Sequence, residues 1–435
     1  MAAPVGGDLG VDVLVIGGGI LGLYLARALH RDYAVCVVAE PDVPVENLDA
    51  TGYFSAGYDG DDVARIQPAR RAAGYWRLWA ESNGVPHTID PWIVMPADDE
   101  GRRLRLWSDA TLASRPETGL PRGMDSGTLQ DLVAHRAEND VVMNPALVMA
   151  ELRKGIEDRV VAAEVVRFGL VTERAIDFVE LQLDDGETVP VTPRYVVLAS
   201  DVANGSLLQR LVTGFKDRAK RKEAVDAMRG CQAVRRRTTI VIRGDLPIMA
   251  GVFDGIEVVS HDHADGWETV WLVSPPIDDH ETVRGPEDVR FAPKLDRQRV
   301  ADTLAKLFAM DPDLESRADD MQWSAYVARQ TEHPMMAVPD ASVIAQPSPA
   351  RLETLEMEGF IAGWPSHLAF AMIVGDVVAE RVRAALGESH GFGDGPQPAD
   401  LRRPSADAQA ARWERSDFPW HDWEDFRDDV GYKPS

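Results

Sequence analysis

The pattern of apolar and polar positions near the N-terminus predicts a strand, a helix and a second strand in close succession. Residues 13–16 are four consecutive aliphatic residues, which is typical of a parallel strand buried on both faces. Apolar residues then recur at helical spacing over residues 21–29. A second apolar run covers residues 35–38. We therefore predict a βαβ unit over residues 12–40.

Three glycines join the first strand to the helix and give this unit a candidate chemistry. Gly17, Gly19 and Gly22 have the G-x-G-x-x-G spacing that allows a tight turn, the approach of a pyrophosphate to helix N–H groups, and close packing of helix on strand. Glu40 follows about twenty residues later, where a carboxylate binds a ribose diol and repels the 2′-phosphate of NADP. The alternative is an ordinary βαβ unit that binds no nucleotide. The predicted nucleotide contacts here are Ile16, Gly17, Gly19, Ile20, Leu21, Gly22 and Glu40.

Beyond this unit the pattern predicts a second sheet of a different kind. A hairpin is expected over residues 178–191, with a separate strand at 195–199. The basic stretch 208–237 indicates a solvated helix, and the interval 85–139 resembles a strand-rich insertion. Later β-branched runs are spaced as antiparallel strands, at residues 238–242, 256–260 and 269–274.

Length, charge and cysteine content exclude several classes of protein. The chain of 435 residues is long enough for two domains, and its formal net charge of −25 disfavours nucleic acids and anionic membranes as partners. Cys36 lies in a predicted buried strand and Cys231 is the other cysteine, so no disulfide framework is expected. No apolar stretch is long enough to span a bilayer, and no basic signal segment opens the sequence. We expect a cytoplasmic protein.

Several segments after the βαβ unit resemble the FAD-dependent D-amino-acid oxidase superfamily, which includes glycine oxidase and monomeric sarcosine oxidase. The loop at residues 51–57 is similar to the Ser- and Gly-containing loop that wraps the flavin in that family. Arg65 precedes a helix that carries tryptophans, as in sarcosine-oxidase-like members. Residues 160–168 resemble the strand that crosses the adenine end. Residues 196–201 resemble a strand and turn of the family, with Asp201 where glycine is usual.

The resemblance continues near the C-terminus, where a strand, the turn at residues 363–367 and a final helix match in order. Arg329 lies where relatives carry an arginine that binds a substrate carboxylate, a role that suits its planar fork. The resemblance implies that Arg65, Arg329 and His367 have catalytic roles. The further implied cofactor contacts are Thr51, Ser55, Ala56, Arg65, Val165, Ala199, Gly363, Trp364 and His367.

The fold implied is α/β, with a Rossmann-like FAD-binding domain and a second domain that holds an antiparallel sheet and the substrate. The tail contains three tryptophans among acidic residues, which we expect to pack on the body of the protein or on a neighbour. The expected boundaries are 1–84, 140–222 and 346–387 for the FAD-binding domain, 85–139 and 223–345 for the substrate domain, and 388–435 for a linker and acidic tail.

The chain lacks a cysteine and a lysine that some members of this superfamily carry. Some relatives attach FAD through a cysteine near residues 320–340, and none is present here, so FAD is expected to be bound non-covalently. Relatives also use a lysine of the substrate-domain sheet to activate oxygen, whereas residues 223–293 contain none. The charge could come instead from Arg235, Arg236, Arg237, His261 or His263. The sequence His261-Asp262-His263 also permits a metal site, but it fits a hairpin turn better, and no metal is expected.

The expected function is oxidation of a C–N bond in an amine or amino acid by hydride transfer to flavin N5. One alternative is a flavin-dependent hydroxylase or tailoring oxidoreductase of secondary metabolism, although Gly375-Asp376 lies too deep in a predicted helix to serve as its ribityl-binding segment. Another is a flavin-binding homologue without turnover. The sequence leaves the substrate, the electron acceptor and the oligomeric state open.

Overall fold

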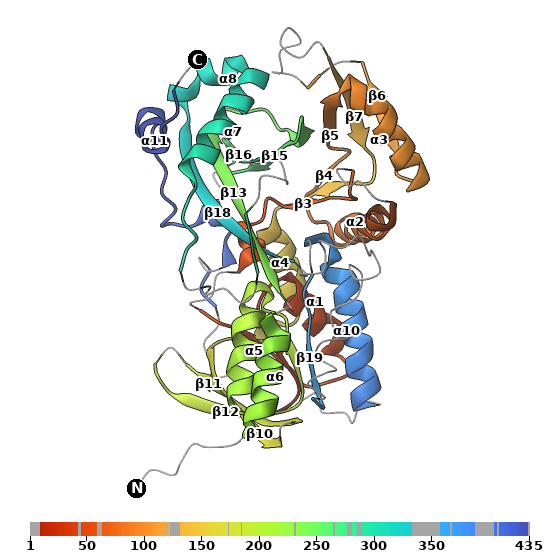
Figure 1. Ribbon diagram of the computed structural model, residues 1–435, viewed down its shortest axis with the longest axis vertical. Helices are drawn as coiled ribbons and strands as arrows, with labels where there is room; N and C mark the ends of the chain where they lie inside the picture. The colour runs from red at the N-terminus through yellow and green to blue at the C-terminus, as the bar shows by residue number, and fades with distance from the viewer. Residues whose placement is uncertain are drawn as a thin grey trace.

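Two large β-sheets organise the protein in its computed structural model, the first in the lower half and the second in the upper half of Figure 1. The structure describes residues 9–41, 45–58, 63–118, 120–121, 131–172, 174–183, 185–229, 232–263, 266–275, 281–284, 289, 291–332, 357–365, 368–387, 404–406 and 409–433.

The first sheet has seven strands in the order β10-β11-β12-β1-β2-β9, and β19 also pairs with β12. β1 runs parallel to β2 and β12, so the predicted βαβ unit is confirmed. The strands are β1 (Leu9–Ile16), β2 (Val35–Ala39), β9 (Val160–Ala162), β10 (Glu164–Thr172), β11 (Ala175–Gln182), β12 (Thr188–Leu198) and β19 (Phe360–Ala362).

Both faces of β1 are buried, which explains its unbroken apolar sequence. Val13 and Val15 belong to a core shared with helices α1, α4 and α10, whereas Leu14 and Ile16 belong to a core shared with α5 and α6. Helices on both faces of a mostly parallel sheet form a doubly wound fold. The helices are α1 (Ile20–Leu29), α4 (Pro145–Arg153), α5 (Asn204–Thr213), α6 (Arg218–Arg229) and α10 (Ala371–Leu386).

Two predictions in this half are wrong in their boundaries. β12 is one continuous strand rather than a hairpin arm and a separate strand, because Val191 pairs with both Val179 of β11 and Leu9 of β1. The basic stretch 208–237 is not one helix, because α5 ends at Thr213 and residues from Ala233 onward already pair with another strand.

The second sheet has nine strands in the order β17-β13-β16-β15-β14-β5-β7-β6, and β18 also pairs with β13. The three predicted β-branched runs are confirmed as the antiparallel neighbours β13, β16 and β15. The strands are β5 (Trp92–Pro96), β6 (Ser114–Glu117), β7 (Leu132–Ala137), β13 (Ala233–Gly244), β14 (Ala250–Phe253), β15 (Ile256–Asp262), β16 (Thr269–Ser274), β17 (Glu281–Arg284) and β18 (Gln322–Glu332).

Helix α3 (Ala97–Asp109) lies inside the interval that was expected to be rich in strands. Only Trp107 of this helix is buried. A helix that buries so little needs no apolar stripe, and the mostly charged sequence of α3 has none to indicate a helix. A small sheet of β3 (Tyr53–Phe54), β8 (Val141–Val142) and β4 (Thr88–Ile89), with helix α2 (Val63–Asn83), lies between the two large sheets (Figure 1). The large sheets use segments from the two expected domains, whose boundaries stay a prediction.

The C-terminal tail packs on the body of the protein, as its tryptophans predict. Trp423 and Phe426 of α11 (Trp423–Val430) join the core beneath α7 (Arg297–Met310) and α8 (Pro312–Ser316). The ring centroids of Trp423 and Trp323 are 4.7 Å apart. Across the described residues, we find no helix with both the length and the apolar character needed to cross a membrane.

Gly22 is a position at which the fold leaves no room for a side chain. A Cβ at Gly22 would lie 1.9 Å from the carbonyl oxygen of Gly17, whereas one at Gly101 in exposed α3 would meet no heavy atom within 4 Å. We predict that Gly22→Ala lowers the free energy of unfolding by about 1–3 kcal/mol. Gly101→Ala should raise it by about 0.5–1 kcal/mol. Urea unfolding of both variants tests this, and equal effects would contradict it.

Candidate active site

The glycine turn lines a cavity at the carboxyl end of β1. Gly17 has a φ of +130°, and a Cβ there would lie 2.3 Å from the carbonyl oxygen of Ala199. A Cβ at Gly19 would lie 2.5 Å from the side-chain oxygen of Asn47. The space beside this turn, including the part open to solvent, is about 370 Å³. This first cavity is lined by Gly17, Gly18, Gly19, Ala39, Glu40, Val45, Glu46, Asn47, Ala199, Ser200 and Asp201.

Glu40 is held at one end of this first cavity. Its Oε1 accepts a hydrogen bond of 3.0 Å from the backbone N–H of Val165, the residue expected near the adenine. Burial raises the pKa of Glu40, and the Val165 hydrogen bond and the charge of Arg210 oppose that rise. The structure therefore brings Gly17, Gly19, Glu40 and Ala199 to one cavity wall, with Val165 bonded to Glu40.

Asn47 is a site residue that the sequence analysis missed. Its Oδ1 accepts a hydrogen bond of 2.8 Å from the backbone N–H of Ile20 at the start of α1, where helix N–H groups lack intrahelical partners. An acceptor at this point shows that the N-terminus of α1 faces the cavity. No local pattern signals this contact, because Asn47 is far from the glycines in sequence. Ile16, Ile20 and Leu21 themselves are buried core residues.

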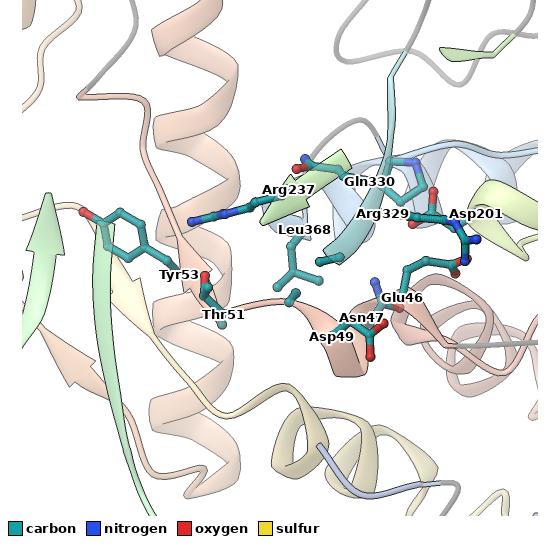
Figure 2. A pocket seen from close by; sticks show the side chains of 14 residues that line it. Glu46, Asn47, Asp49, Thr51, Tyr53, Asp201, Arg237, Arg329, Gln330 and Leu368 are labelled. Carbon is teal, nitrogen blue, oxygen red and sulfur yellow. The ribbon is translucent and has the colours of Figure 1, made fainter. Parts of the chain in front are cut away.

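A second cavity, with an empty volume of about 610 Å³, adjoins the first and shares Glu46, Asn47 and Asp201 with it (Figure 2). Its walls come from η1 (Glu46–Asp49) and the loop that follows, from β13 and β18, and from the turn after β19. The two adjoining cavities, together called the trough below, have walls from both large sheets. The second cavity is lined by Glu46, Asn47, Asp49, Ala50, Thr51, Gly52, Tyr53, Asp201, Arg237, Ala328, Arg329, Gln330, Pro365 and Leu368.

Carboxylates gather where the two cavities meet. Glu46 is 7% exposed, and its Oε1 has no hydrogen-bond partner among the described residues. Burial, and then the charge of Asp201, raises the pKa of Glu46 well above its usual value. Burial also raises the pKa of Asp201 to about 6. Asp201 has a φ of +48°, a conformation that aspartate tolerates, so the backbone follows a path that glycine would take.

Two arginines of the second sheet bring positive charge to the second cavity. Arg329 is buried and donates hydrogen bonds to the carbonyl oxygens of Val289 and Phe291. Arg237 pairs with Glu257 at 2.6 Å, and its Nε has no hydrogen-bond partner among the described residues. Figure 2 shows Arg329 beside Glu46 and Asp201, and Arg237 on the side of Tyr53.

The remaining predicted residues are less tightly grouped. Thr51 lines the second cavity, whereas Ser55 lines a separate one beside α3, and Ala56 is buried with its N–H bonded to Asp140. Gly363 and Trp364 lie next to the second cavity, but the Trp364 side chain packs in the core and donates to Gln232. Arg65 is in the first turn of α2, with its side chain outside the described residues, and His367 is outside them altogether. The roles of all these residues stay predictions.

The sequence matches the family described as FAD dependent oxidoreductase over residues 12–381. The chain belongs to this family. The predictions of an enzyme, of FAD as its cofactor and of a D-amino-acid-oxidase-like fold are therefore confirmed. No curated protein matches the chain significantly.

Solved structures similar to this chain share its fold at low sequence identity. An FAD-dependent oxidoreductase from Pseudomonas aeruginosa is 20% identical, with a TM-score of 0.62 over 92% of this chain and 96% of the other. An L-amino acid deaminase from Proteus vulgaris is 18% identical, with a TM-score of 0.59 over 89% and 93%. A glycine oxidase from Geobacillus kaustophilus is 15% identical, with a TM-score of 0.58 over 92% and 100%.

We predict that Glu40→Ala weakens FAD binding about 10- to 100-fold, because it removes a charged acceptor from the predicted ribose site. Glu164→Gln, at an exposed glutamate next to Val165, is the control and should bind FAD like the wild type. Quenching of flavin fluorescence on titration of the apoprotein measures both dissociation constants. Equal affinity of the Glu40 and Glu164 variants would contradict a ribose role for Glu40.

The buried carboxyl of Asp201 predicts a pH-dependent stability. The pKa of Asp201 is about 6 in the folded protein, above the ordinary value of 3.8. The favourable contribution of this carboxyl to the free energy of unfolding is therefore complete below pH 3.8 and is lost as the pH rises through 6. The variant Asp201→Asn lacks this titration. Compared with that of the wild-type apoprotein, its free energy of unfolding should therefore be higher at pH 7 than at pH 4, by about 2–3 kcal/mol. Asp254→Asn is the matched control, since Asp254 also has a positive φ but is exposed. Urea unfolding at both pH values decides, and equal pH dependence of the two variants refutes the prediction.

Proposed function

We propose that this enzyme oxidises the C–N bond of an amine or amino acid, with an amino acid favoured. The FAD supplies the oxidising chemistry, by accepting a hydride from the carbon that carries the nitrogen. The protein's own contribution is to hold cofactor and substrate in register and to keep water from the reacting atoms.

The residues of the trough fit FAD in one orientation. We place the ribose of the adenosine at Glu40 and the diphosphate at Gly17–Gly19, where a Cβ would fill the space and the N-terminus of α1 is near. The flavin then extends into the second cavity, between residues 46–53 and strands β13 and β18. This placement leaves the substrate between the flavin and the second sheet.

The observation that carries the proposal is that a basic and an acidic side chain, each with an unpartnered polar atom, line the same cavity. Arg237 and Glu46 both line the second cavity, and Arg237 Nε and Glu46 Oε1 have no hydrogen-bond partner among the described residues. An amino acid carries a carboxylate for the first group and an amino group for the second. A buried charge of either sign is costly without a partner, so a ligand with both charges suits this cavity better than a neutral one.

Arg237 is a stronger candidate than Arg329 for the substrate carboxylate. Both line the cavity, but Arg329 directs hydrogen bonds to backbone carbonyls of residues 289 and 291. Arg237 is fixed by Glu257, whose Oε1 also accepts a 2.6 Å hydrogen bond from Thr51. A guanidinium that one carboxylate holds in place and that keeps an unpartnered N–H is suited to bind a second carboxylate.

Several solved structures that share the fold have names consistent with this class of substrate, namely an L-amino acid deaminase, a glycine oxidase and an L-proline dehydrogenase. Another structure with the fold is an L-α-glycerophosphate oxidase, so the fold alone does not select the substrate. The hydroxylase alternative has less support, because Asp376 lies inside α10 and accepts a 2.6 Å hydrogen bond from Tyr24.

Anaerobic reduction of the FAD-loaded protein tests the proposal directly. A panel of L- and D-amino acids, secondary amines and matched 2-hydroxy acids is mixed with the protein in a stopped-flow instrument. We expect at least one amino acid or amine to bleach the oxidised flavin, and the hydroxy acids to leave it unchanged. Bleaching by hydroxy acids alone, or by no member of the panel, would refute the proposed function.

Once a substrate is known, Arg237→Gln should raise its KM about 10- to 100-fold, because a charged hydrogen bond to its carboxylate is lost. The corresponding amine without a carboxylate should be oxidised equally well by variant and wild type. Arg243→Gln is the control, since Arg243 is on the same strand but pairs with Glu268. An unchanged KM in the Arg237 variant would exclude it as the carboxylate anchor.

A further inference from the structure

The C-terminal segment 409–420 follows the end of the family match at residue 381, yet it reaches the wall of the second cavity. Trp413 and Phe418 pack against a face of the second sheet that includes Tyr326 and Ala328 of β18. Trp413 is 1% exposed. This segment therefore packs on the body of the protein, and its Arg412 and Glu414 contact residues of the first half of the chain.

Arg412, in the short helix η10 (Arg412–Glu414), pairs with Asp49 at the end of η1. Its Nη1 lies 3.3 Å from Asp49 Oδ2, and its guanidinium lies over the ring of Tyr326 at 5.3 Å. The hydroxyl of Tyr326 donates a 2.8 Å hydrogen bond to the backbone oxygen of Asp49. The side chain of Asp49 is thus held by the tail, and its main chain by β18.

The tail makes two further contacts near the pair of Arg412 and Asp49, one through Trp413 and one through Glu414. Trp413 stacks on His261, with ring centroids 5.4 Å apart and an angle of 8° between planes. The Nε2 of His261 donates a 2.7 Å hydrogen bond to the backbone oxygen of Thr51. Glu414 accepts a 3.1 Å hydrogen bond from Asn144, which caps α4. Residues 49–51 are therefore anchored to the tail at two points.

The second oxygen of Asp49 is the feature that points to a ligand. Asp49 is 5% exposed and lines the second cavity, and its Oδ1 has no hydrogen-bond partner among the described residues. Arg412, Arg415 and Arg329 oppose the effect of burial on this carboxyl, whose pKa is nevertheless raised. A buried acceptor without a donor is costly, so a donor on the bound ligand would relieve that cost.

We propose that Arg412 is a positioning residue of the flavin site, which holds Asp49 so that Oδ1 accepts a hydrogen bond from the ligand in the second cavity. The chemistry required is a hydroxyl or ammonium donor. Two sources supply it, namely a ribityl hydroxyl of FAD and the amino group of the substrate. The second source rests on the proposed function, whereas the first requires only that FAD binds.

The experiment measures FAD binding and catalysis in Arg412→Gln, Arg412→Lys and Asp49→Asn. Arg427→Gln is the matched control, because Arg427 is on α11 of the same tail and pairs with exposed Asp428. The FAD dissociation constant of each apoprotein comes from quenching of flavin fluorescence. The visible spectrum of the bound flavin, the melting temperature, and KM and kcat are recorded beside it.

We expect Arg412→Gln and Asp49→Asn each to weaken one ligand about tenfold or more. Their double variant should be little worse than either single variant, because both remove the same interaction. Arg412→Lys should restore part of the loss, and Arg427→Gln should match the wild type. A higher FAD dissociation constant with an altered flavin spectrum assigns the donor to the cofactor, and a higher KM with unchanged kcat assigns it to the substrate.

The proposal is overturned if Arg412→Gln and Asp49→Asn bind both FAD and substrate like the wild type. If Arg412→Gln does not fold, Asp49→Asn alone decides, since it keeps the shape of the side chain. If no amine or amino acid reduces the wild-type flavin, the proposed function fails, and the FAD titration decides the role of Arg412 independently.

Discussion

The structure depends on close contact between three backbone segments at the carboxyl end of β1. The turn after β1 is pressed between the start of α1 and the end of β12, since a Cβ at Gly22 would meet the oxygen of Gly17 and a Cβ at Gly17 would meet that of Ala199. Three parallel strands reach the same edge here, and the N–H of Gly17 bonds to Val38 of β2. The first cavity opens at this edge because the strands end while their helices turn away.

A second constraint is electrostatic. The chain carries 71 acidic residues, and three of its carboxylates, at Glu46, Asp49 and Asp201, line the second cavity. Burying them is costly unless cations or donors face them. The cations come from β18 and from the tail, through Arg329 and Arg412. The charges of the trough thus link the first half of the chain to the second sheet.

The sequence predicts the features that arise from local pattern. The glycine turn, both strands of the βαβ unit and the three antiparallel runs follow from residue spacing, and Glu40 lies at the edge of the cavity as expected. Arg237 was one of several candidate cations, because the strand pattern does not show which of three adjacent arginines reaches the cavity. Asn47 and the pairing of Asp49 with Arg412 were missed, since chain folding joins residues far apart in sequence. The charged helix α3 was missed because it buries a single tryptophan.

Strand β18 explains how a tail beyond the family match can influence a flavin site. Near its start, Trp323 packs against Trp423 of the tail, and the backbone of Trp323 bonds to that of His421. In its middle, Tyr326 lies beneath Arg412 and bonds to Asp49. Towards its end, Ala328, Arg329 and Gln330 form the cavity wall. One strand, which pairs with β13 along its whole length, therefore carries both the contacts with the tail and part of the cavity wall.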